Sequence, residues 1–450
     1  MRPPTEAEIH PPASRGRLLR VLGLGFGLAV IIGNTIGAGI LSTPGTIAQN
    51  LPNGWLFIGV WIVGGLYALL GAVSIAELGT MIPRSGGQYV FAHDALGDYA
   101  GFIVGWSDWI STCGASSFIS LIIAQYAGVL FPALAGRTTA LALAIVAAFG
   151  VIQWRGIRWG SGVQNLTSLL KALAFTILVT ACFALGSRTT ISTAATAQIP
   201  HGLKLFVALI LALQGVIYTY DGWTGVIYFS EEVRNPARDI PRSMFGGVLS
   251  VIALYLLVNL AILYVLPISE IAGSDLALGK AAQTIFGPNG DRIFRSLMIL
   301  SMLSAVNACQ LMATRVLFAM SRDGLFSMKG ARANEGGTPT VALFLSTLIS
   351  ALFILTGTVD QVLAVVAFFF VVNYAISFSV VFVLRRRDRD RTRPYRAWGY
   401  PWTTGFSLLG SLAFLGGAVA GDTRNSIYAL ALLAASYPTF RFTKWLSTRG

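Results

Sequence analysis

The feature that most constrains this chain is a glycine-rich stretch inside its first apolar segment. The stretch runs from Ile31 to Leu41, with the sequence IIGNTIGAGIL, and lies within an apolar run from Leu18 to Ala48. That run is long enough to cross a membrane, since a transmembrane helix needs about 20 residues. Its three glycines fall at mid-membrane depth, where each costs a helix about 1 kcal/mol relative to alanine. Since unwound backbone is tolerated at this depth only where it is buried in protein or lines a cavity, we predict a broken helix whose free N–H and C=O groups meet a small polar solute.

The composition is that of an integral membrane protein. Of the 450 residues, 55% are hydrophobic and 11% are charged, with a mean hydropathy of +0.69. The net charge of +13 is compatible with a nucleic-acid partner, but the basic residues fall in short loops. The preference of Lys and Arg for the cytoplasmic loops of membrane proteins explains these positions better, so we expect no nucleic-acid partner. Residues 1–17 are polar and rich in proline, without a signal peptide, and predict a disordered cytoplasmic tail.

No residue pattern predicts an enzyme, a cofactor or a metal site. The three cysteines, Cys113, Cys182 and Cys309, lie in apolar segments, so neither a disulfide framework nor a zinc site is expected. The histidines are scattered, and the sequence contains no nucleophile elbow, phosphate-binding loop or paired-carboxylate motif. A membrane enzyme would need such groups clustered near one face, so we expect no enzymatic activity.

Hydropathy predicts an all-α membrane protein with twelve transmembrane helices. Placing the N-terminus in the cytoplasm puts most of the 32 basic residues on the cytoplasmic side, among them seven arginines between Arg385 and Arg396. Because cytoplasmic loops carry an excess of Lys and Arg, we predict that both termini are cytoplasmic. The predicted spans are 21–49, 55–82, 96–130, 138–154, 162–186, 203–231, 243–267, 292–321, 340–357, 361–384, 402–420 and 425–442.

A second interrupted span follows in the sixth predicted helix. Its sequence, GVIYTYDGWTGVIYFSEE, contains Gly215, Gly222 and Gly225, with Asp221 near its centre. Two interrupted segments at corresponding positions of two halves point to a transporter site. We therefore infer an inverted repeat of five plus five spans, followed by a basic loop, two further spans and a short tail. The corresponding ranges are 18–187, 203–386 and 387–450.

Five motifs follow one another along the chain: IIGNTIGAGIL, AELGTMIPRSGGQYVF, YDGW with SEEVRNPARDIPRS, NACQLMATRVLFAMSRDGLF, and RPYRAWGYPW. Together they resemble the amino acid–polyamine–organocation superfamily, and within it the L-type amino acid transporter-like permeases. The resemblance implies the leucine-transporter fold and movement of amino acids or related amines across the plasma or inner cell membrane by alternating access. A polyamine or organocation carrier of this fold is the alternative. A channel or receptor is disfavoured because it would not need two half-helix sites.

An amino acid presents a carboxylate and an ammonium side by side, so its site needs donors and acceptors together. The half-helix after the first break points its N–H groups at the cavity, and we predict that those of Ala38 and Gly39 bind the carboxylate. We predict that the carbonyls of Thr35 and Ile36, with Tyr218, bind the ammonium, and the resemblance supports both assignments. Alternatively, these glycines only permit close helix packing.

Tyr218 and Asp221 carry further predictions in the sixth span. The resemblance places Tyr218 at the aromatic gate over bound substrate, where its ring face can attract a cation. Alternatively, Tyr218 is a packing residue. A carboxylate inside a membrane is costly unless paired, which makes Asp221 a functional candidate. Three roles stay open for Asp221: binding the side chain of a cationic substrate, carrying a coupling proton, or capping the second half-helix.

Lys171 is the basic residue deep inside the fifth span, where an ammonium needs a partner. By resemblance, it takes the place of the bound sodium ion of sodium-dependent relatives and braces the first and eighth helices. We therefore expect sodium-independent transport, either by exchange or by proton coupling. The alternative is a lysine that snorkels to the membrane surface.

Further polar residues lie within the predicted spans. Asn307 is predicted to face the cavity from the eighth span, and Asn373 and Tyr374 are candidates for its far wall in the tenth. Glu77, near the cytoplasmic end of the second span, is expected to pair with loop arginines. Asp108, in the third span, receives no role.

The predicted loop between the third and fourth spans, FPALAGRTTA, contains no cysteine. Animal L-type transporters carry a cysteine in this loop that joins a glycoprotein, so the resemblance implies no disulfide-linked heavy chain here. The expected partners are an amino acid or amine substrate and the membrane lipid.

Overall fold

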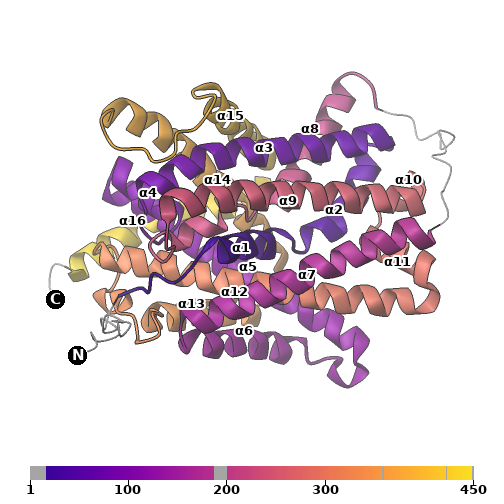
Figure 1. Ribbon diagram of the computed structural model, residues 1–450, viewed down its shortest axis with the longest axis horizontal. Helices are drawn as coiled ribbons and strands as arrows, with labels where there is room; N and C mark the ends of the chain where they lie inside the picture. Colours follow the sequence, from indigo (N-terminus) through magenta and orange to yellow (C-terminus); the bar gives the residue numbers. More distant parts are fainter. Residues whose placement is uncertain (1–16, 187–199, 357–358, 422, 448–450) are drawn as a thin grey trace, which may run out of the picture.

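The computed structural model describes residues 17–186, 200–356, 359–421 and 423–447. Within these ranges the regular structure is helical, apart from two isolated β-bridges. The long helices pack side by side, most of them along a common axis (Figure 1). This agrees with the predicted all-α class. Of the predicted tail 1–17, only Arg17 falls within the described residues.

Thirteen long helical segments follow one another along the described ranges. They are α1 (Leu24–Thr35), α2 (Gly39–Asn50), α3 (Gly54–Met81), α5 (Asp98–Leu130), α6 (Thr138–Trp154), α7 (Ile157–Leu185), α8 (Leu203–Tyr220), α9 (Pro236–Val265), α12 (Gly290–Arg322), α13 (Thr340–Thr356), α14 (Val359–Arg387), α15 (Trp402–Gly421) and α16 (Thr423–Ser447). Shorter segments are α4 (Gln88–Leu96), α10 (Ile268–Ile271), α11 (Ala277–Phe286), η1 (Pro132–Leu134), η2 (Gly225–Phe229), η3 (Gly287–Asn289) and η4 (Met328–Ala331).

Each of the twelve predicted spans overlaps one long helix, or in the first case the pair α1 and α2. Among the described residues, eight helical segments are long and apolar enough to cross a membrane, and the bent pair raises the number to nine. Helices α6 and α13 are apolar but have 17 residues each. Their length is about 25 Å, against about 30 Å for the hydrocarbon core of a membrane. The count of twelve spans therefore stays a prediction.

The break predicted in the first span is confirmed. Helix α1 ends at Thr35 and α2 begins at Gly39, and the directions of the two helices differ by 47°. Ile36 has backbone angles outside the helical region (φ −78°, ψ 88°), which ends the hydrogen-bonded ladder of α1. The N–H and C=O groups released here need partners from the protein or from a bound solute, because the membrane interior supplies no water.

The interruption of the sixth span lies at residues 221–224. Helix α8 continues through Gly215 and ends at Tyr220, so the predicted interruption at Gly215 is wrong. Gly222 has φ +110°, and a Cβ there would lie 2.8 Å from the backbone nitrogen of Thr35. Glycine allows both this conformation and this close approach, which brings the two breaks into contact.

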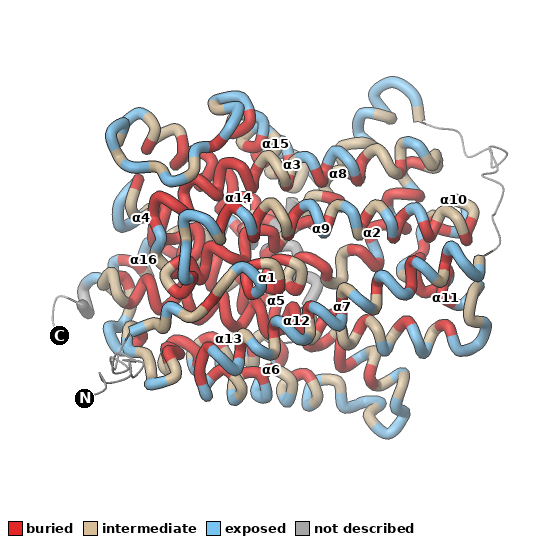
Figure 2. The backbone as a smooth tube through the Cα atoms, in the orientation of Figure 1, coloured by how far each residue is buried: buried red, intermediate tan, exposed pale blue. Residues whose placement is uncertain are grey.

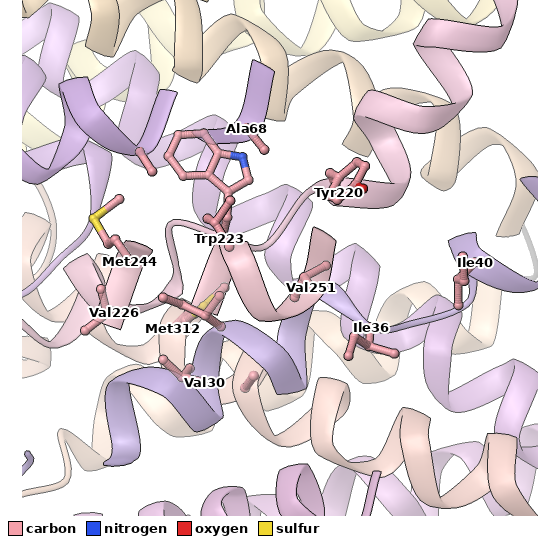
Figure 3. Packing of buried hydrophobic residues seen from close by; sticks show 14 of the residues in the cluster. Val30, Ile36, Ile40, Ala68, Tyr220, Trp223, Val226, Met244, Val251 and Met312 are labelled. Carbon is pink, nitrogen blue, oxygen red and sulfur yellow. The ribbon is translucent and has the colours of Figure 1, made fainter. Parts of the chain in front are cut away.

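The two breaks lie within a continuous hydrophobic core. Figure 2 shows buried residues concentrated in the middle of the helix assembly. Figure 3 shows two of them, Ile36 between α1 and α2, and Trp223 on the segment that follows α8. The outer faces carry exposed apolar side chains, such as Ile177 on α7 (67% exposed) and Phe406 on α15 (61%). Apolar surface of this kind is unfavourable in water and suits the hydrocarbon of a membrane.

Ion pairs gather at one end of the helix assembly. Glu77 on α3 accepts hydrogen bonds from Arg385 at the end of α14 (2.6 and 2.7 Å) and lies 3.2 Å from Arg393 of the following loop. The expected pairing of Glu77 with loop arginines is thus confirmed. Lys444 of α16 pairs with Asp98 at the start of α5, and Figure 1 shows α4 and α16 at the same end. The charged ends of these helices therefore share one side of the molecule.

The buried pair of Arg315 and Glu232 should contribute strongly to stability. Both side chains are fully buried, and two hydrogen bonds of 3.0 Å join them. Replacing Arg315 with methionine would leave a buried carboxylate unpaired, which costs about 3–5 kcal/mol. We expect a marked fall in the thermal unfolding temperature of the detergent-purified protein.

The neighbouring pair of Arg322 and Glu231 provides a matched control, since its side chains are 30% and 33% exposed. We expect Arg322→Met to lower the free energy of unfolding by less than about 1 kcal/mol. Equal losses in the two variants would contradict the importance of the buried pair.

Candidate functional site

A cavity of about 80 Å³ lies where the two helix breaks meet. A single water molecule needs about 10–15 Å³ on the same measure, so the cavity has room for a small solute. Its wall comes from the α1–α2 break, α5, the end of α8, α12 and α14. The lining residues are Asn34, Thr35, Gly37, Ala38, Gly39, Thr112, Ala115, Phe118, Ile119, Tyr218, Thr219, Asp221, Cys309, Met312, Val366 and Phe370.

Three larger hollows lie away from the breaks, with volumes of about 330, 460 and 530 Å³. Two of them are apolar grooves between helices, one at α6 and α13 and one at α7 and α9. The third lies beside α11 and the segment that precedes it. None of these three touches the interrupted backbone, so the central cavity is the candidate site.

The N-terminal end of α2 faces the cavity with free backbone donors. Ala38 and Gly39 both line the cavity, and no side chain caps this helix. Among the described residues, none accepts a hydrogen bond from either of these N–H groups. Unpaired donors at the positive end of a helix dipole suit an anion. This geometry is compatible with the predicted carboxylate-binding role of Ala38 and Gly39.

The carbonyl groups at the end of α1 are largely engaged by the protein itself. Ile36 O accepts hydrogen bonds from Lys171 Nζ (2.5 Å) and Ser301 Oγ (3.2 Å), and Ile36 does not line the cavity. A carbonyl oxygen has two lone pairs, so the prediction that Ile36 binds an ammonium group is wrong. Thr35 O accepts one hydrogen bond, from Tyr255 (2.8 Å), and Thr35 does line the cavity. Thr35 therefore keeps one free acceptor position.

Asn34 is a cavity residue that sequence reasoning missed. Its carbonyl oxygen accepts no hydrogen bond from another described residue, and its side-chain oxygen accepts one from Cys309 Sγ (3.6 Å). Asn34 is the only amide side chain in the stretch IIGNTIGAGIL, and this polar residue beside a glycine break could have identified it. Asn34 supplies the free acceptor that Ile36 does not.

Lys171 on α7 is fully buried and points inward to the first break. Its ammonium donates to Gly33 O (2.7 Å) and to Ile36 O (2.5 Å). Two serines of α12 donate to the same oxygens, Ser304 to Gly33 and Ser301 to Ile36, both at 3.2 Å. This placement contradicts a snorkelling lysine. Donors from α7 and α12 thus converge on the end of α1, in the arrangement expected of a brace.

Asp221 and Tyr218 line the cavity from the end of α8. The Asp221 carboxylate accepts hydrogen bonds from the Tyr374 hydroxyl of α14 and from the backbone N–H of Gly222. Asp221 therefore stands at the second break as a half-buried acceptor with two donors and no cation among the described residues. Because Asp221 also lines the cavity, its carboxylate can interact with a bound solute as a third partner.

The wall on α14 differs from the predicted one. Val366 and Phe370 line the cavity, whereas Tyr374 and Asn373 do not. The ring of Tyr374 is stacked on Trp223, with centroids 5.1 Å apart. Asn373 is fully buried against α5. The predicted placement of Asn373 and Tyr374 was thus wrong by about one helical turn.

Asn307 also lies outside the cavity wall, contrary to the prediction. Its amide nitrogen donates to Gln164 Oε1 (2.8 Å) and to Gly160 O (3.1 Å), and its oxygen accepts from Gln153 (3.0 Å). The side chain is fully buried. Asn307 thus links α12 to α6 and α7, and its polar atoms have partners within the protein.

The rest of the cavity wall is mostly apolar. Among the lining residues, Asp221 is the one carboxylate, and none is Lys, Arg or His. In the part of the chain that the structure describes, no group of three or more His, Cys, Asp or Glu could hold a metal. The cavity therefore combines backbone donors, backbone acceptors and one carboxylate, which suits a small zwitterion. Its apolar side chains are Ala115, Phe118, Ile119, Met312, Val366 and Phe370.

Replacing Lys171 with methionine tests the brace at the first break. The variant loses two charge-assisted hydrogen bonds, each contributing about 1.5–3 kcal/mol, and leaves only the two serine hydroxyls at these carbonyls. We expect amino acid uptake, the activity that the sequence predicts, to fall at least about tenfold, which corresponds to about 1.4 kcal/mol. Lys204→Met, at an exposed site near the start of α8, is the matched control. Equal uptake by the two variants would refute the brace.

Comparisons with known proteins agree with this geometry. The model of the amino acid permease family matches residues 26–436. The serine/threonine exchanger SteT of Bacillus subtilis (strain 168) is 29% identical over 431 residues, which cover 94% of this chain and 96% of that protein. The b(0,+)-type amino acid transporter 1 of Homo sapiens is 26% identical over 388 residues, covering 84% and 79% of the two chains. The large neutral amino acids transporter small subunit 2 of Oryctolagus cuniculus is 28% identical over 411 residues, covering 87% and 75%.

These matches confirm the family that the motifs predict. They agree with the apolar helices and with a cavity built on interrupted backbone. The chain belongs to the amino acid permease family, and it is a multi-pass membrane transporter rather than an enzyme.

Proposed function

We propose that the protein is a sodium-independent secondary transporter that moves amino acids across the cell membrane by alternating access. The observation that carries the proposal is the cavity at two interrupted helices, which presents free N–H groups of α2 together with the carboxylate of Asp221. Interrupted helices place such donors and acceptors near mid-membrane depth. The three relatives are all named as amino acid transporters or exchangers, which supports the same substrate class.

In the proposed binding mode, the N–H groups of Ala38 and Gly39 hold the substrate carboxylate. The free carbonyl positions of Asn34 and Thr35 accept from its ammonium, and the ring of Tyr218 closes over it. A polyamine or other organocation has no carboxylate, so it would leave the donors of α2 without a partner, at a cost of about 1–3 kcal/mol for each unsatisfied group. This favours amino acids over polyamines.

Asp221 completes the acceptor side of the site in this proposal. Its carboxylate accepts from Tyr374 and Gly222 and still borders the cavity. It can bind the ammonium common to all amino acids or the cationic side chain of a basic one, and both roles use the same charge. Capping of the second half-helix fits less well, because η2 begins at Gly225 and has no side-chain cap.

Sodium independence follows in this proposal from the position of Lys171. Its ammonium engages the oxygens of Gly33 and Ile36, which are the hard oxygen ligands that a small cation would need. The fixed positive charge then stabilises the end of α1 without a bound ion. Transport would be driven either by exchange of one amino acid for another or by a proton gradient.

The proposed architecture has twelve spans and a repeat of residues 18–187 and 203–386, with 387–450 appended. Its support is that an interrupted segment opens each half, α1 with α2 in the first and α8 with η2 in the second. Both termini are placed in the cytoplasm, beside the ion-paired end of the helix assembly. All three cysteines are buried, which supports the absence of a disulfide-linked heavy chain.

Counterflow tests the transport function. Purified protein in liposomes loaded with unlabelled amino acids should accumulate the same radiolabelled amino acids from outside, in a saturable way. Replacing external Na⁺ with choline should leave the rate unchanged, since Lys171 occupies the carbonyl oxygens that Na⁺ would need. Repeating the assay with single amino acids and with amines, with and without a pH gradient, identifies the substrate and the coupling. The absence of counterflow for every substrate, or a requirement for Na⁺, would contradict the proposal.

Gly39→Val tests the carboxylate site. A side chain at Gly39 would meet Thr219, whose Oγ1 and Cα lie 2.9 and 3.1 Å from the position of its Cβ, and would fill space beside the free N–H groups. We expect uptake to fall at least about tenfold, which corresponds to about 1.4 kcal/mol, while the protein still elutes as a single species from size exclusion. Gly59→Val, at a helical position with no atom within 4 Å of the new Cβ, should behave like the unmodified protein. Unchanged uptake by Gly39→Val would remove Gly39 from the site.

A further inference from the structure

Three carboxylate residues are fully buried among the described residues, and one of them has no cation. Glu77 pairs with Arg385, and Glu232 pairs with Arg315. Asp108, in the first half of α5, forms no ion pair with any described residue. An ionised carboxylate in that position is costly, because burial removes its hydration and no opposite charge replaces it.

The contacts of Asp108 fit a carboxyl group that carries a proton. Tyr228 Oη, on η2, lies 2.9 Å from both Oδ1 and Oδ2. A phenol hydroxyl has one proton, so it can donate well to only one of these oxygens at a time. If the carboxyl is also protonated, its O–H donates to Oη while the phenol donates to the other oxygen. Both 2.9 Å contacts are then complete hydrogen bonds.

Asp108 lies directly behind the substrate cavity. Thr112, one turn further along α5, lines the cavity, and its hydroxyl is 3.4 Å from Asp108 Oδ1. The second carboxylate, Asp221, lines the same cavity as Thr112, and its negative charge disfavours a second charge on Asp108. Two carboxylates with no cation between them resist simultaneous ionisation, so one of the pair holds a proton. Asp221 has two donors and access to the cavity, which makes Asp108 the better place for that proton.

The titratable groups that face Asp108 are Tyr228 of η2 and Asp221 of the second break. Helices α6 and α13, which also pack against α5, contain no titratable residue. On the other helices packed against α5, four titratable groups have partners of their own. Arg315 on α12 pairs with Glu232, Tyr89 on α4 donates to Asp323, Tyr374 on α14 donates to Asp221, and Lys444 on α16 pairs with Asp98.

We propose that Asp108 is the proton-binding residue that makes transport depend on pH: its protonated form supports the transport cycle, and its deprotonation at higher pH, which movement of the segment that carries Tyr228 permits, arrests the cycle. Segment η2 follows directly on the second helix break, so a rearrangement of that break displaces Tyr228 relative to α5. In the proton-transfer step the O–H bond of the acid breaks, the proton passes to water, and a carboxylate remains. The inference rests on the proposed transport function and adds the group that makes transport depend on pH.

The test is counterflow in proteoliposomes over a range of pH, with equal pH inside and outside. A mixture of neutral amino acids is unlabelled inside and radiolabelled outside. We expect the rate of the unmodified protein to fall as pH rises, approaching about tenfold per pH unit above the midpoint as the protonated fraction declines. Asp108→Asn has the same shape and is permanently neutral, so it should keep the low-pH rate at every pH.

Ser107→Ala is the matched control, because it changes the adjacent residue of α5 and removes a hydrogen bond to Asn373 (3.0 Å) without removing an acid. It should retain the pH profile of the unmodified protein. Infrared difference spectra between low and high pH should contain the carbonyl band of a protonated carboxylic acid, and Asp108→Asn should lack it. A structural role for Asp108 would not remove this band.

A pH-independent rate in the unmodified protein, or a matching profile in Asp108→Asn, overturns the proposal. So does loss of the pH dependence in Asp221→Asn but not in Asp108→Asn. If Asp108→Asn does not fold, Tyr228→Phe decides the question: it removes a phenol donor whose hydrogen bond is strongest to the ionised carboxylate, so the midpoint should move to higher pH, and an unmoved midpoint overturns the proposal. A protein that exchanges no amino acid at any pH would refute the transport function instead.

Discussion

The need to satisfy backbone groups released at the first helix break governs the centre of this protein. Membrane hydrocarbon offers no hydrogen bonds, so each free C=O or N–H requires a protein group or a bound solute. Side chains of the protein itself donate hydrogen bonds to the released carbonyl groups. Lys171 and two serines donate to the carbonyl oxygens of Gly33 and Ile36, and Tyr255 donates to that of Thr35. The backbone N–H groups at the start of α2, by contrast, remain unpaired among the described residues and face the cavity. This asymmetry gives the cavity its polarity, with donors exposed and most acceptors engaged.

Buried charge is distributed according to the same physical rule. Glu77 and Glu232 lie with their arginines towards the ion-paired end, where bidentate contacts offset the cost of burial. Near the cavity, Asp221 and Asp108 have hydroxyl and backbone donors but no cation from the described part of the chain. A transporter can use that imbalance, because an ammonium or a proton supplies the missing positive charge. The acids that pair with arginines hold helices together, whereas the acids without a cation can still bind an ammonium group or a proton.

Several parts of the site follow from sequence, and others do not. Glycines in an apolar run predict the first break, and an intramembrane acid beside Gly222 points to the second. The same logic fails at Gly215, where α8 remains helical, because glycine permits a break without requiring one. The prediction that Asn307 faces the cavity also fails, because Gln153 and Gln164 hydrogen-bond to its side chain. Which face of a helix meets the cavity depends on the rotation of the helix about its axis. The sequence of a mostly apolar span predicts that rotation poorly.

The sequence by itself determined that the chain crosses a membrane in helices, that its first span is broken, and that its family is one of amino acid carriers. These follow from local composition and from ordered motifs, which need no knowledge of neighbours. Only the tertiary structure decided which released groups stay free, because a partner such as Lys171 lies more than a hundred residues from the carbonyls it engages. The same holds for Asp108, since its lack of a cation among the described residues depends on every helix packed around α5. Hydrogen-bond satisfaction in a low-dielectric interior is a property of the assembled helices.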